Sequence, residues 1–274
     1  MYLDHFGLRQ APFRITPHTE FFFAGADRGA MLDALIYAIT HDEGIVKVSG
    51  EVGSGKTMLC RMLLERLPDH VETVYLANPM LSQDEILFAI AADLHVSLPE
   101  GSRHSLLRSL QERLLEIYAA GRQVVVLIDE AHAMPLEALE EIRLLSNLES
   151  SCHKLLQIVL FGQPELDQRL RDTAMRQLKE RITHHFRLLP LQRNDIAVYL
   201  MFRLRAAGYR GPDLFSGGAI RLISKVSEGL TRRINILADK ALLAAFSERA
   251  HQIAGRQVRA AIRDAQFSRI DRRL

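Results

Sequence analysis

The 274-residue sequence has few cysteines, little net charge and no long apolar run, and each absence excludes a class of protein. Its two cysteines, Cys60 and Cys152, lack the spacing of a metal site or a redox pair, so we expect reduced thiols in a cytoplasmic protein. A formal net charge of +2 is too small to indicate nucleic acid or an anionic membrane surface as the main partner. No apolar stretch approaches the roughly 20 residues that span a bilayer. The opening residues also lack the basic start and apolar core of a signal peptide, so we expect a cytoplasmic protein with no integral membrane segment.

The strongest motif is a glycine-rich loop at residues 50–57. Its sequence, Gly-Glu-Val-Gly-Ser-Gly-Lys-Thr, fits G-x-x-x-x-G-K-[ST], the phosphate-binding (Walker A) loop of nucleoside triphosphatases. A strand-like run precedes it and a helix-like pattern over 58–67 follows, which is the arrangement that points a helix N-terminus at an anion. The lysine would contact the β- and γ-phosphates and the threonine would contact Mg²⁺. The predicted nucleotide-binding residues are Gly50, Glu51, Val52, Gly53, Ser54, Gly55, Lys56, Thr57 and Met58.

A second motif follows a buried strand at residues 123–128. Five consecutive apolar residues end at Asp129 and Glu130, and two carboxylates at such a strand end are costly unless a cation lies near them. With a phosphate loop upstream, this pattern predicts a Walker B strand. Asp129 would position Mg²⁺ and Glu130 would orient or deprotonate the attacking water. The alternative is an acidic pair that only caps a structural strand. His132 is either a γ-phosphate sensor or a helix-start or surface histidine.

The remaining pattern predicts an α/β protein with a parallel sheet. Strand-like runs at 44–49, 72–77, 123–128, 154–161 and 184–189 alternate with helical segments, including 82–94, 106–120 and 135–149. Gln163 follows the fourth run, beside the predicted Walker B strand, where it would contact the γ-phosphate or the water, or else serve only as a turn residue. From Leu191 the pattern is helical throughout.

These patterns divide the chain into three parts. Residues 1–26 form an N-terminal strap rich in proline and phenylalanine, whose rings either lie against the base of a nucleotide or cover the core. Residues 27–190 form the phosphate-loop core, and residues 191–274 form a small helical lid. In the lid, Arg232 stands at a helix N-terminus, where the helix dipole disfavours cations. This position predicts contact with nucleotide phosphate, against the alternative of a solvated Arg232–Arg233 pair.

Together the phosphate loop, the Asp129–Glu130 pair, the strand-end Gln163 and Gly229-x-x-Arg232 in the helical lid resemble the AAA+ ATPases. Several further segments resemble the ExeA/GspA family, which contains ATPases of general secretion and of mannose-sensitive (MSHA, MshM-like) pilus biogenesis. These segments are Met-Tyr-Leu-Asp-His-Phe-Gly-Leu at 1–8, Pro12-Phe13, Thr16-Pro17, the phenylalanines at 21–23, the loop at 50–57, Phe-Gly-Gln-Pro-Glu-Leu at 161–166 and Arg232-x-Ile-Asn235. Secretion members continue into a transmembrane helix and a peptidoglycan-binding domain, whereas this sequence ends at Leu274, so we expect a closer likeness to the short pilus members. Gln163 replaces the asparagine common in AAA+ proteins.

The resemblance implies a P-loop (AAA+) core with a helical lid, ATP/ADP and Mg²⁺ as cofactors, and ATP hydrolysis that drives or gates assembly of a secretion or type IV (MSHA-like) pilus machine. It also implies a nucleotide-dependent homo-oligomer, a membrane-bound partner and a cytoplasmic or peripheral inner-membrane location. A neighbouring subunit would supply an arginine to the site, with Arg181 the first candidate and Arg176 the second, against a helix-end arginine that only stabilises the dipole. Two other functions stay open: a DNA-associated transposition regulator of the TniB/TnsC type, and a scaffold that hydrolyses slowly or not at all.

Overall fold

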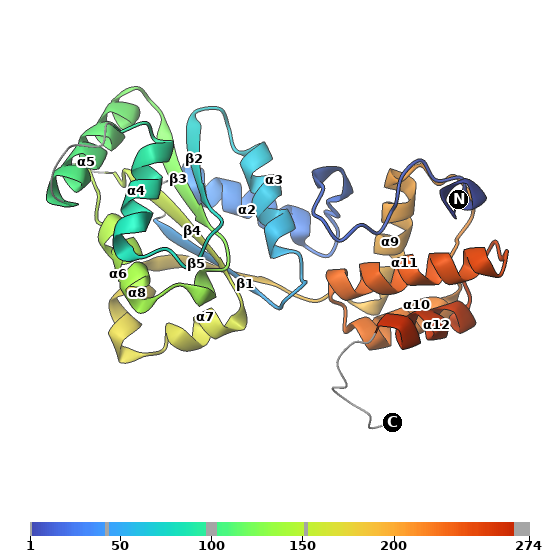
Figure 1. Cartoon of the computed structure of the whole chain (residues 1–274). Coiled ribbons are helices and arrows are strands. Elements are labelled where there is room, and N and C mark those ends of the chain that lie inside the picture. Colours follow the sequence, from blue (N-terminus) through green and yellow to red (C-terminus); the bar gives the residue numbers. More distant parts are fainter. Residues whose placement is uncertain (1, 42–43, 97–102, 151–152, 266–274) are drawn as a thin grey trace. The chain divides into compact units, whose positions relative to one another are not determined.

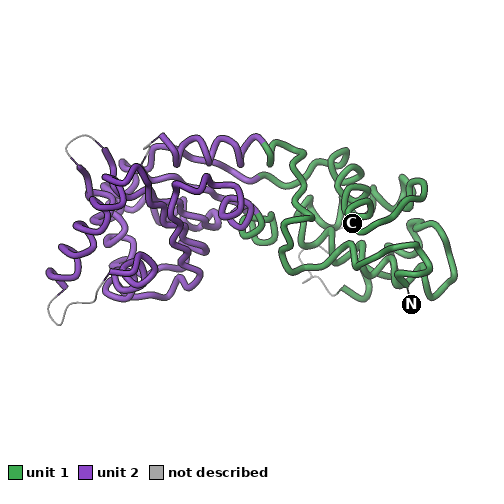
Figure 2. The backbone as a smooth tube through the Cα atoms, turned by 90° about the horizontal axis from the view of Figure 1, so that it is seen from above, with its two compact units in different colours: residues 1–29, 51–58, 189–274 green, residues 30–50, 59–188 purple. Residues whose placement is uncertain are grey.

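The computed structural model describes residues 2–41, 44–96, 103–150 and 153–265 (Figure 1). The chain folds as two compact units, shown in green and purple in Figure 2. Unit 1 comprises Met1–Gly29, Glu51–Met58 and Leu189–Leu274, and unit 2 comprises Ala30–Gly50 and Leu59–Leu188. The phosphate loop therefore packs in the same unit as the strap and the C-terminal helices. The prediction for Cys152 lies outside the described residues.

Unit 2 is built on a five-stranded sheet in which all neighbouring strands are parallel, as the sequence predicts. The strand order is β2-β3-β4-β1-β5. The strands are β1 (Ile45–Gly50), β2 (Val71–Leu76), β3 (Gln123–Ile128), β4 (Leu156–Gly162) and β5 (Ile182–Leu188). The inner strands β1 and β4 are buried along their whole length, whereas the edge strand β5 alternates buried and exposed residues. Parallel strands end at one edge of the sheet, so the segments that follow β1, β3 and β4 all leave from that edge.

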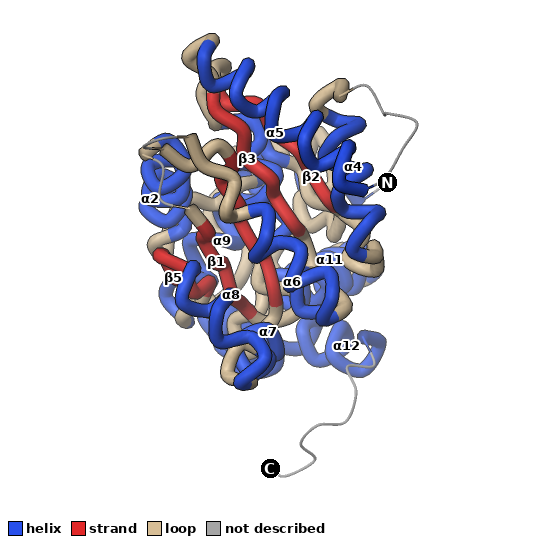
Figure 3. Tube along the Cα trace, turned by 90° about the vertical axis from the view of Figure 1, so that its left-hand side faces the viewer, coloured by secondary structure: helices blue, strands red, loops and turns tan. Residues whose placement is uncertain are grey.

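Helices cover both faces of this sheet. On one face lie α4 (Gln83–Asp93), α5 (Arg103–Ala119), α6 (Leu136–Leu145) and α8 (Arg176–Arg181), which share a core with the strand residues that face them (Figure 3). On the other face lie α2 (Arg28–Thr40) and α3 (Lys56–Arg66) (Figure 1). The short segments η2 (Ala131–Ala133), α7 (Pro164–Arg169) and η3 (Thr173–Met175) follow the carboxyl ends of β3 and β4. Among the described residues, no helix is long and apolar enough to cross a membrane.

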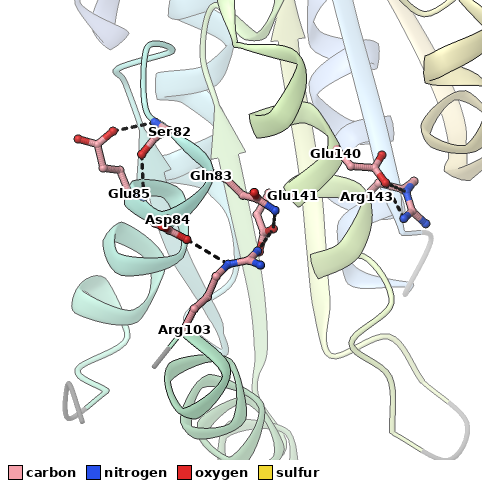
Figure 4. A network of polar contacts seen from close by, with 8 residues as sticks. All are labelled: Ser82, Gln83, Asp84, Glu85, Arg103, Glu140, Glu141 and Arg143. Carbon is pink, nitrogen blue, oxygen red and sulfur yellow. Dashed lines mark hydrogen bonds and ion pairs between the residues drawn. The ribbon is translucent and has the colours of Figure 1, made fainter. Parts of the chain in front are cut away.

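Helix α4 begins with the capping box that its sequence predicts. The hydroxyl of Ser82 accepts a hydrogen bond from the Glu85 N–H at 3.3 Å, and the Glu85 carboxylate accepts one from the Ser82 N–H at 2.7 Å (Figure 4). Two N–H groups that a helix start leaves without intrahelical partners are thereby satisfied. The start of α4 is fixed by local sequence.

A buried carboxylate joins the starts of α4 and α5 to α6. The side chain of Glu141 on α6 is 1% exposed and accepts hydrogen bonds from Gln83 at 2.8 Å and from Arg103. Arg103 also pairs with Asp84 at 3.1 Å, so its guanidinium bridges two acidic side chains (Figure 4). A buried charge is tolerable only with such partners, and the removal of one of them is strongly destabilising. The cluster holds these three helices in register.

Helix α6 ends earlier than its sequence pattern predicts. We expected the helix to run from Pro135 to Glu149, but it ends at Leu145. The Ser146 hydroxyl donates to the Arg143 carbonyl at 2.7 Å, and the chain then turns so that Glu149 bridges to Lys154 in an antiparallel pair. A serine hydroxyl that competes for a helix carbonyl, followed by a cross-chain bridge, outweighs the helical periodicity.

Unit 1 is a helical core that the N-terminal strap completes. Its helices are α1 (Tyr2–Phe6), η1 (Thr19–Phe21), α9 (Arg193–Ala206), α10 (Gly217–Ser227), α11 (Thr231–Ser247) and α12 (Gly255–Ala265). The rings of Phe6, Phe13 and Phe21 are buried in one cluster with apolar residues of α9 to α12. Of the two interpretations of the strap, this packing matches the one in which its rings cover the core.

A buried arginine fixes the strap to α9. Arg203 donates from Nε to the Pro12 carbonyl at 2.6 Å and from Nη2 to the Arg14 carbonyl at 3.2 Å. Its guanidinium also lies 4.4 Å from the centre of the Phe21 ring, within cation–π range. Burial lowers the pKa of Arg203. Because proline-rich segments supply free carbonyls but few N–H donors, an arginine is well suited to hold one.

Gly229, in the turn between α10 and α11, occupies a position that only glycine fits. Its φ is +76°, in the left-handed region. Its carbonyl accepts a hydrogen bond from the Leu191 N–H at 2.9 Å, and a Cβ at this position would lie 2.3 Å from the Leu191 carbonyl oxygen. The turn that leads into α11 is thus packed directly against backbone.

We expect Gly229→Ala to destabilise the protein by about 2 kcal/mol or more, because alanine adds both left-handed strain and a clash with backbone. The thermal midpoint of unfolding, followed by circular dichroism, measures this loss. Gly217→Ala is the matched control, since Gly217 is the first residue of α10 and a Cβ there meets nothing within 4 Å. Equal midpoints for the two variants would contradict the role assigned to Gly229.

Candidate functional site

The glycine loop joins β1 to α3 and has the backbone that phosphate binding requires. Gly53 and Gly55 have φ values of +78° and +107°, which turn successive N–H groups toward one side. Lys56 is the first residue of α3, so the loop leads directly into a helix N-terminus. This conformation follows from the glycine spacing noted in the sequence.

Two buried polar side chains in the loop fit an anionic ligand. Lys56 is 4% exposed, and its ammonium donates to the carbonyl of Glu51 at 3.2 Å within the same loop. Ser54 is 1% exposed, and its hydroxyl oxygen has no hydrogen-bond partner among the described residues. A buried cation and an unsatisfied buried hydroxyl both cost free energy that a bound phosphate would offset. The loop residues therefore fit a nucleotide phosphate.

The same loop provides the N-terminal cap of α11. The carbonyl oxygen of Gly53 accepts hydrogen bonds from the Thr231 hydroxyl at 2.8 Å and from the Arg232 N–H at 3.0 Å. Leu230, the residue before α11, has an apolar side chain that cannot cap the helix. A Cβ at Gly53 would lie 2.8 Å from the Cβ of Arg232, so the arginine stem passes directly over the loop. The glycine loop and Arg232, which are both predicted to contact nucleotide, are thus adjacent within unit 1.

Arg232 and Arg233 differ in their surroundings. Arg233 forms an ion pair with Glu228 at 2.5 Å. Arg232 forms no ion pair or side-chain hydrogen bond with any residue that the structure describes, although its backbone is fixed against the loop. The guanidinium at the loop is therefore the one available to an added anion.

In unit 2, β3 ends at a buried carboxylate. Asp129 is 4% exposed, its N–H donates to the Leu76 carbonyl at 3.1 Å, and its Oδ1 accepts from the Glu130 N–H at 2.9 Å. Burial, together with the nearby Asp129 charge, raises the pKa of Tyr75 to about 12. Burial also raises the pKa of the Cys60 thiol on α3, with a smaller contribution from Asp129. Burial is thus the main cause of both shifts, and the Asp129 charge adds to it in each case.

The two predicted Mg²⁺ ligands, Thr57 and Asp129, each carry an oxygen of the kind that Mg²⁺ binds together with phosphate. Among the described residues, no group of three or more histidine, cysteine, aspartate or glutamate side chains is placed to hold a metal ion. Mg²⁺ is usually held by one or two protein oxygens, with phosphate and water completing its coordination. The Thr57 hydroxyl and the Asp129 carboxylate are donors of that kind.

Two neighbouring side chains approach the Glu130 carboxylate, and one of them, Gln163, hydrogen-bonds to it. Oε2 of Glu130 accepts a hydrogen bond from Gln163 Nε2 at 3.1 Å and lies 3.4 Å from Nδ1 of His132. Gln163 follows β4, the strand beside β3, as the sequence predicts, but here its amide contacts the glutamate. His132 lies in η2 with its side chain mostly buried, so it is not an exposed surface histidine.

Sequence reasoning missed a second set of contacts around this turn. Arg169 at the end of α7 donates from Nη1 to the carbonyls of His132 and Met134, each at 2.7 Å. Asp167 on α7 pairs with Lys47, a buried lysine of β1. A lysine in the middle of an otherwise apolar strand was a visible signal of a buried partner, whereas Arg169 carried no such signal.

The arginines of α8 are placed next to the edge strand. Arg181 ends the helix, and β5 begins at the next residue. Within the described part of the chain, Arg181 has no hydrogen bond or ion pair, whereas Arg176 pairs with Glu180 at 3.0 Å. The pKa of Lys154 is lowered by burial and by the nearby Arg181 charge. Arg181 therefore lies close enough to Lys154 for its charge to act on that lysine.

Comparisons with known proteins find similarity to AAA proteins. Residues 39–170 match the family model described as an AAA domain. The chain is 41% identical over 254 residues to general secretion pathway protein A of Aeromonas hydrophila, an alignment that covers 92% of this chain and 46% of that protein. The chain thus spans about half the length of this curated relative.

Solved structures share the fold at low sequence identity. The ORC2 protein of Aeropyrum pernix, in its ADPNP–ADP complexes, has a TM-score of 0.66 at 16% identity, covering 93% of this chain and 73% of that one. Cdc6p of Pyrobaculum aerophilum has a TM-score of 0.70 at 19% identity, covering 94% and 71%. These likenesses confirm the predicted fold, a parallel-sheet P-loop core with C-terminal helices.

The different surroundings of the two arginines give a prediction. We expect Arg232→Ala to weaken ATP binding by about tenfold or more, the loss of one charge-assisted contact, and Arg233→Ala to change it less than about twofold. Titration of the purified variants with a fluorescent ATP analogue measures both. Equal, negligible effects of the two substitutions would instead support the alternative that Arg232 and Arg233 are a solvated surface pair.

Proposed function

We propose that this chain, which belongs to the ExeA/GspA family of AAA ATPases, binds ATP with Mg²⁺ and hydrolyses it to ADP and phosphate. The observation that carries this proposal is the glycine loop between β1 and α3, in which Lys56 is buried at the start of a helix. Such a loop is built for the phosphates of a nucleotide. The other expected residues follow strands whose carboxyl ends share an edge of the sheet with β1.

In this proposal the glycine loop binds the nucleotide, and Asp129 and Glu130 take part in its hydrolysis. Backbone N–H groups of residues 50–58 and the Lys56 ammonium hold the phosphates, and Arg232 adds a charge from the helical region. Mg²⁺, held by Thr57 and Asp129, would neutralise charge on the transferred phosphoryl group. Glu130 accepts a proton from the attacking water or orients it, and Gln163 positions the Glu130 carboxylate.

The work that hydrolysis drives is proposed from the relative. Because the shared region includes almost this whole chain, we infer that the protein powers or gates assembly of a secretion or type IV (MSHA-like) pilus machine through a membrane-bound partner. It would act as a nucleotide-dependent oligomer in the cytoplasm or at the inner membrane. Turnover stimulated by DNA would instead favour the transposition-regulator alternative, and ATP binding without turnover would favour the scaffold.

The binding and chemical roles are separable by substitution. We expect Lys56→Ala to weaken ATP binding about tenfold or more, because it removes a buried charge-assisted contact. Glu130→Gln should bind ATP normally and lose turnover by about 10²-fold or more, the usual contribution of a general base. Phosphate-release assays and ATP titrations give the two quantities. Wild-type turnover in a pure Glu130→Gln sample would remove Glu130 from the reaction.

The trans role of Arg181 gives a second test. If Arg181 acts on the neighbouring subunit's nucleotide, specific activity rises with protein concentration and Arg181→Ala lowers turnover by about 10³-fold or more. Mixing Arg181→Ala with Lys56→Ala subunits restores part of the rate, because each supplies what the other lacks. Arg176→Ala is the matched control, since its side chain is already paired with Glu180 on the same helix. Concentration-independent activity, with full activity in Arg181→Ala, would contradict this role.

A further inference from the structure

The turn after β3 is held in an unfavourable backbone conformation. Glu130 has φ 52° and ψ 33°, the left-handed region, although it is not a glycine. A residue with a side chain is strained in such a conformation and keeps it only where surrounding contacts determine it. The Glu130 carbonyl accepts the Ala133 N–H at 2.9 Å, which closes the first turn of η2.

The contacts that fix this turn come from Arg169. Its Nη1 donates to the carbonyls of His132 and Met134, the second and fourth residues after Glu130. Hydrogen bonds from a charged donor are roughly twice as strong as neutral ones, and one nitrogen here restrains two points of the same short turn. Arg169 therefore holds the backbone on the C-terminal side of Glu130.

Helix α7 is itself attached firmly to the sheet. Leu166 is fully buried, and Asp167 pairs with Lys47, whose side chain is 6% exposed in the inner strand β1. The residue just before α7 is Gln163, which donates to Oε2 of Glu130. One six-residue helix thus contacts the turn from both ends: the amide of Gln163 on the glutamate side chain and the guanidinium of Arg169 on the backbone.

These contacts involve one oxygen of the Glu130 carboxylate and leave the other, Oε1, available to accept a proton. Gln163 and His132 both approach Oε2 of Glu130. Oε1 makes no hydrogen bond or ion pair with any residue described in the structure, and the side chain is 39% exposed. A base needs one oxygen within reach of the proton that it accepts and a fixed orientation for the other.

We propose that Arg169 is a positioning residue for Glu130, fixing the left-handed turn so that Oε1 faces the reacting water. This inference rests on the proposed ATPase function for its kinetic consequence, but the effect on the turn itself does not. Arg169 acts through the two carbonyls, so its loss changes the chemical step and leaves nucleotide affinity unchanged.

The first test separates turnover from binding. Arg169→Met should lower kcat by about tenfold or more, since small misplacements of a catalytic group cost up to about 10²-fold, with less than about twofold change in the Kd for ATP. Arg169→Lys should recover most of the rate, because an ammonium has donors for both carbonyls. Arg171→Met is the matched control: Arg171 is exposed, two residues further on, and its side chain makes no hydrogen bond or ion pair with a described residue. Equal losses in Arg171→Met, or weakened ATP binding in Arg169→Met, would overturn the proposal.

A double-mutant cycle tests whether Arg169 acts through Glu130. Added to Glu130→Gln, Arg169→Met should lower the residual single-turnover rate by less than about twofold, because effects of residues that act as a unit do not multiply. Losses that multiply would mean that Arg169 acts independently, for instance on a neighbouring subunit's nucleotide, and would overturn the proposal.

Hydrogen exchange tests the turn without hydrolysis. In Arg169→Met the amides of residues 131–134 should exchange faster than in wild type, while those of α4 stay unchanged. A wild-type protein without ATPase activity would refute the proposed function yet leave this measurement decisive for the turn. Unchanged exchange at residues 131–134 would overturn the positioning role whatever the activity.

Discussion

The two hydrogen bonds accepted by the Gly53 carbonyl are the constraint on which much of unit 1 depends. One comes from the Thr231 hydroxyl and one from the Arg232 N–H, so both lone pairs of a single backbone oxygen are used. The loop conformation that presents N–H groups to an anion also starts α11, the longest helix of the unit. A change in the shape of the loop therefore changes the cap of this helix, and the absence of a side chain at Gly53 is required on both counts.

In unit 2 a different helix, α7, fixes the turn that follows a strand. The strained Glu130 backbone, the Gln163 amide and the Arg169 guanidinium all meet around α7, and the Lys47–Asp167 pair attaches that helix to the inner strand β1. In both units a short segment next to a strand end is held by contacts from residues far away in sequence. The rigid sheet sets the positions of the strand ends, and these distant contacts set the orientation of the turns and loops that leave them.

The parts that the sequence predicts are those governed by local rules. The strands, the glycine loop and the Ser82 capping box follow from periodicity, φ preferences and short-range hydrogen bonds. The early end of α6 was missed because Glu149 forms an antiparallel bridge with Lys154, a contact that helical periodicity does not reveal. The Gly53–Thr231 and Arg169 contacts could not be predicted, since nothing in one sequence states which distant carbonyl an arginine or threonine will meet. The sequence left two interpretations of the strap open, because aromatic residues favour burial but do not specify whether they pack against a nucleotide base or against the protein core.

The burial of the Cys60 thiol affects how sensitive the candidate site is to oxidation and alkylation. Cys60 stands four residues after Lys56, where a reactive cysteine would make nucleotide binding sensitive to oxidants and alkylating agents. Burial and the neighbouring Asp129 both favour the protonated thiol, and the thiolate is the form that reacts. A sulfur in this position acts as a small apolar core group, so the chemistry of the loop is insulated from the redox state of its surroundings.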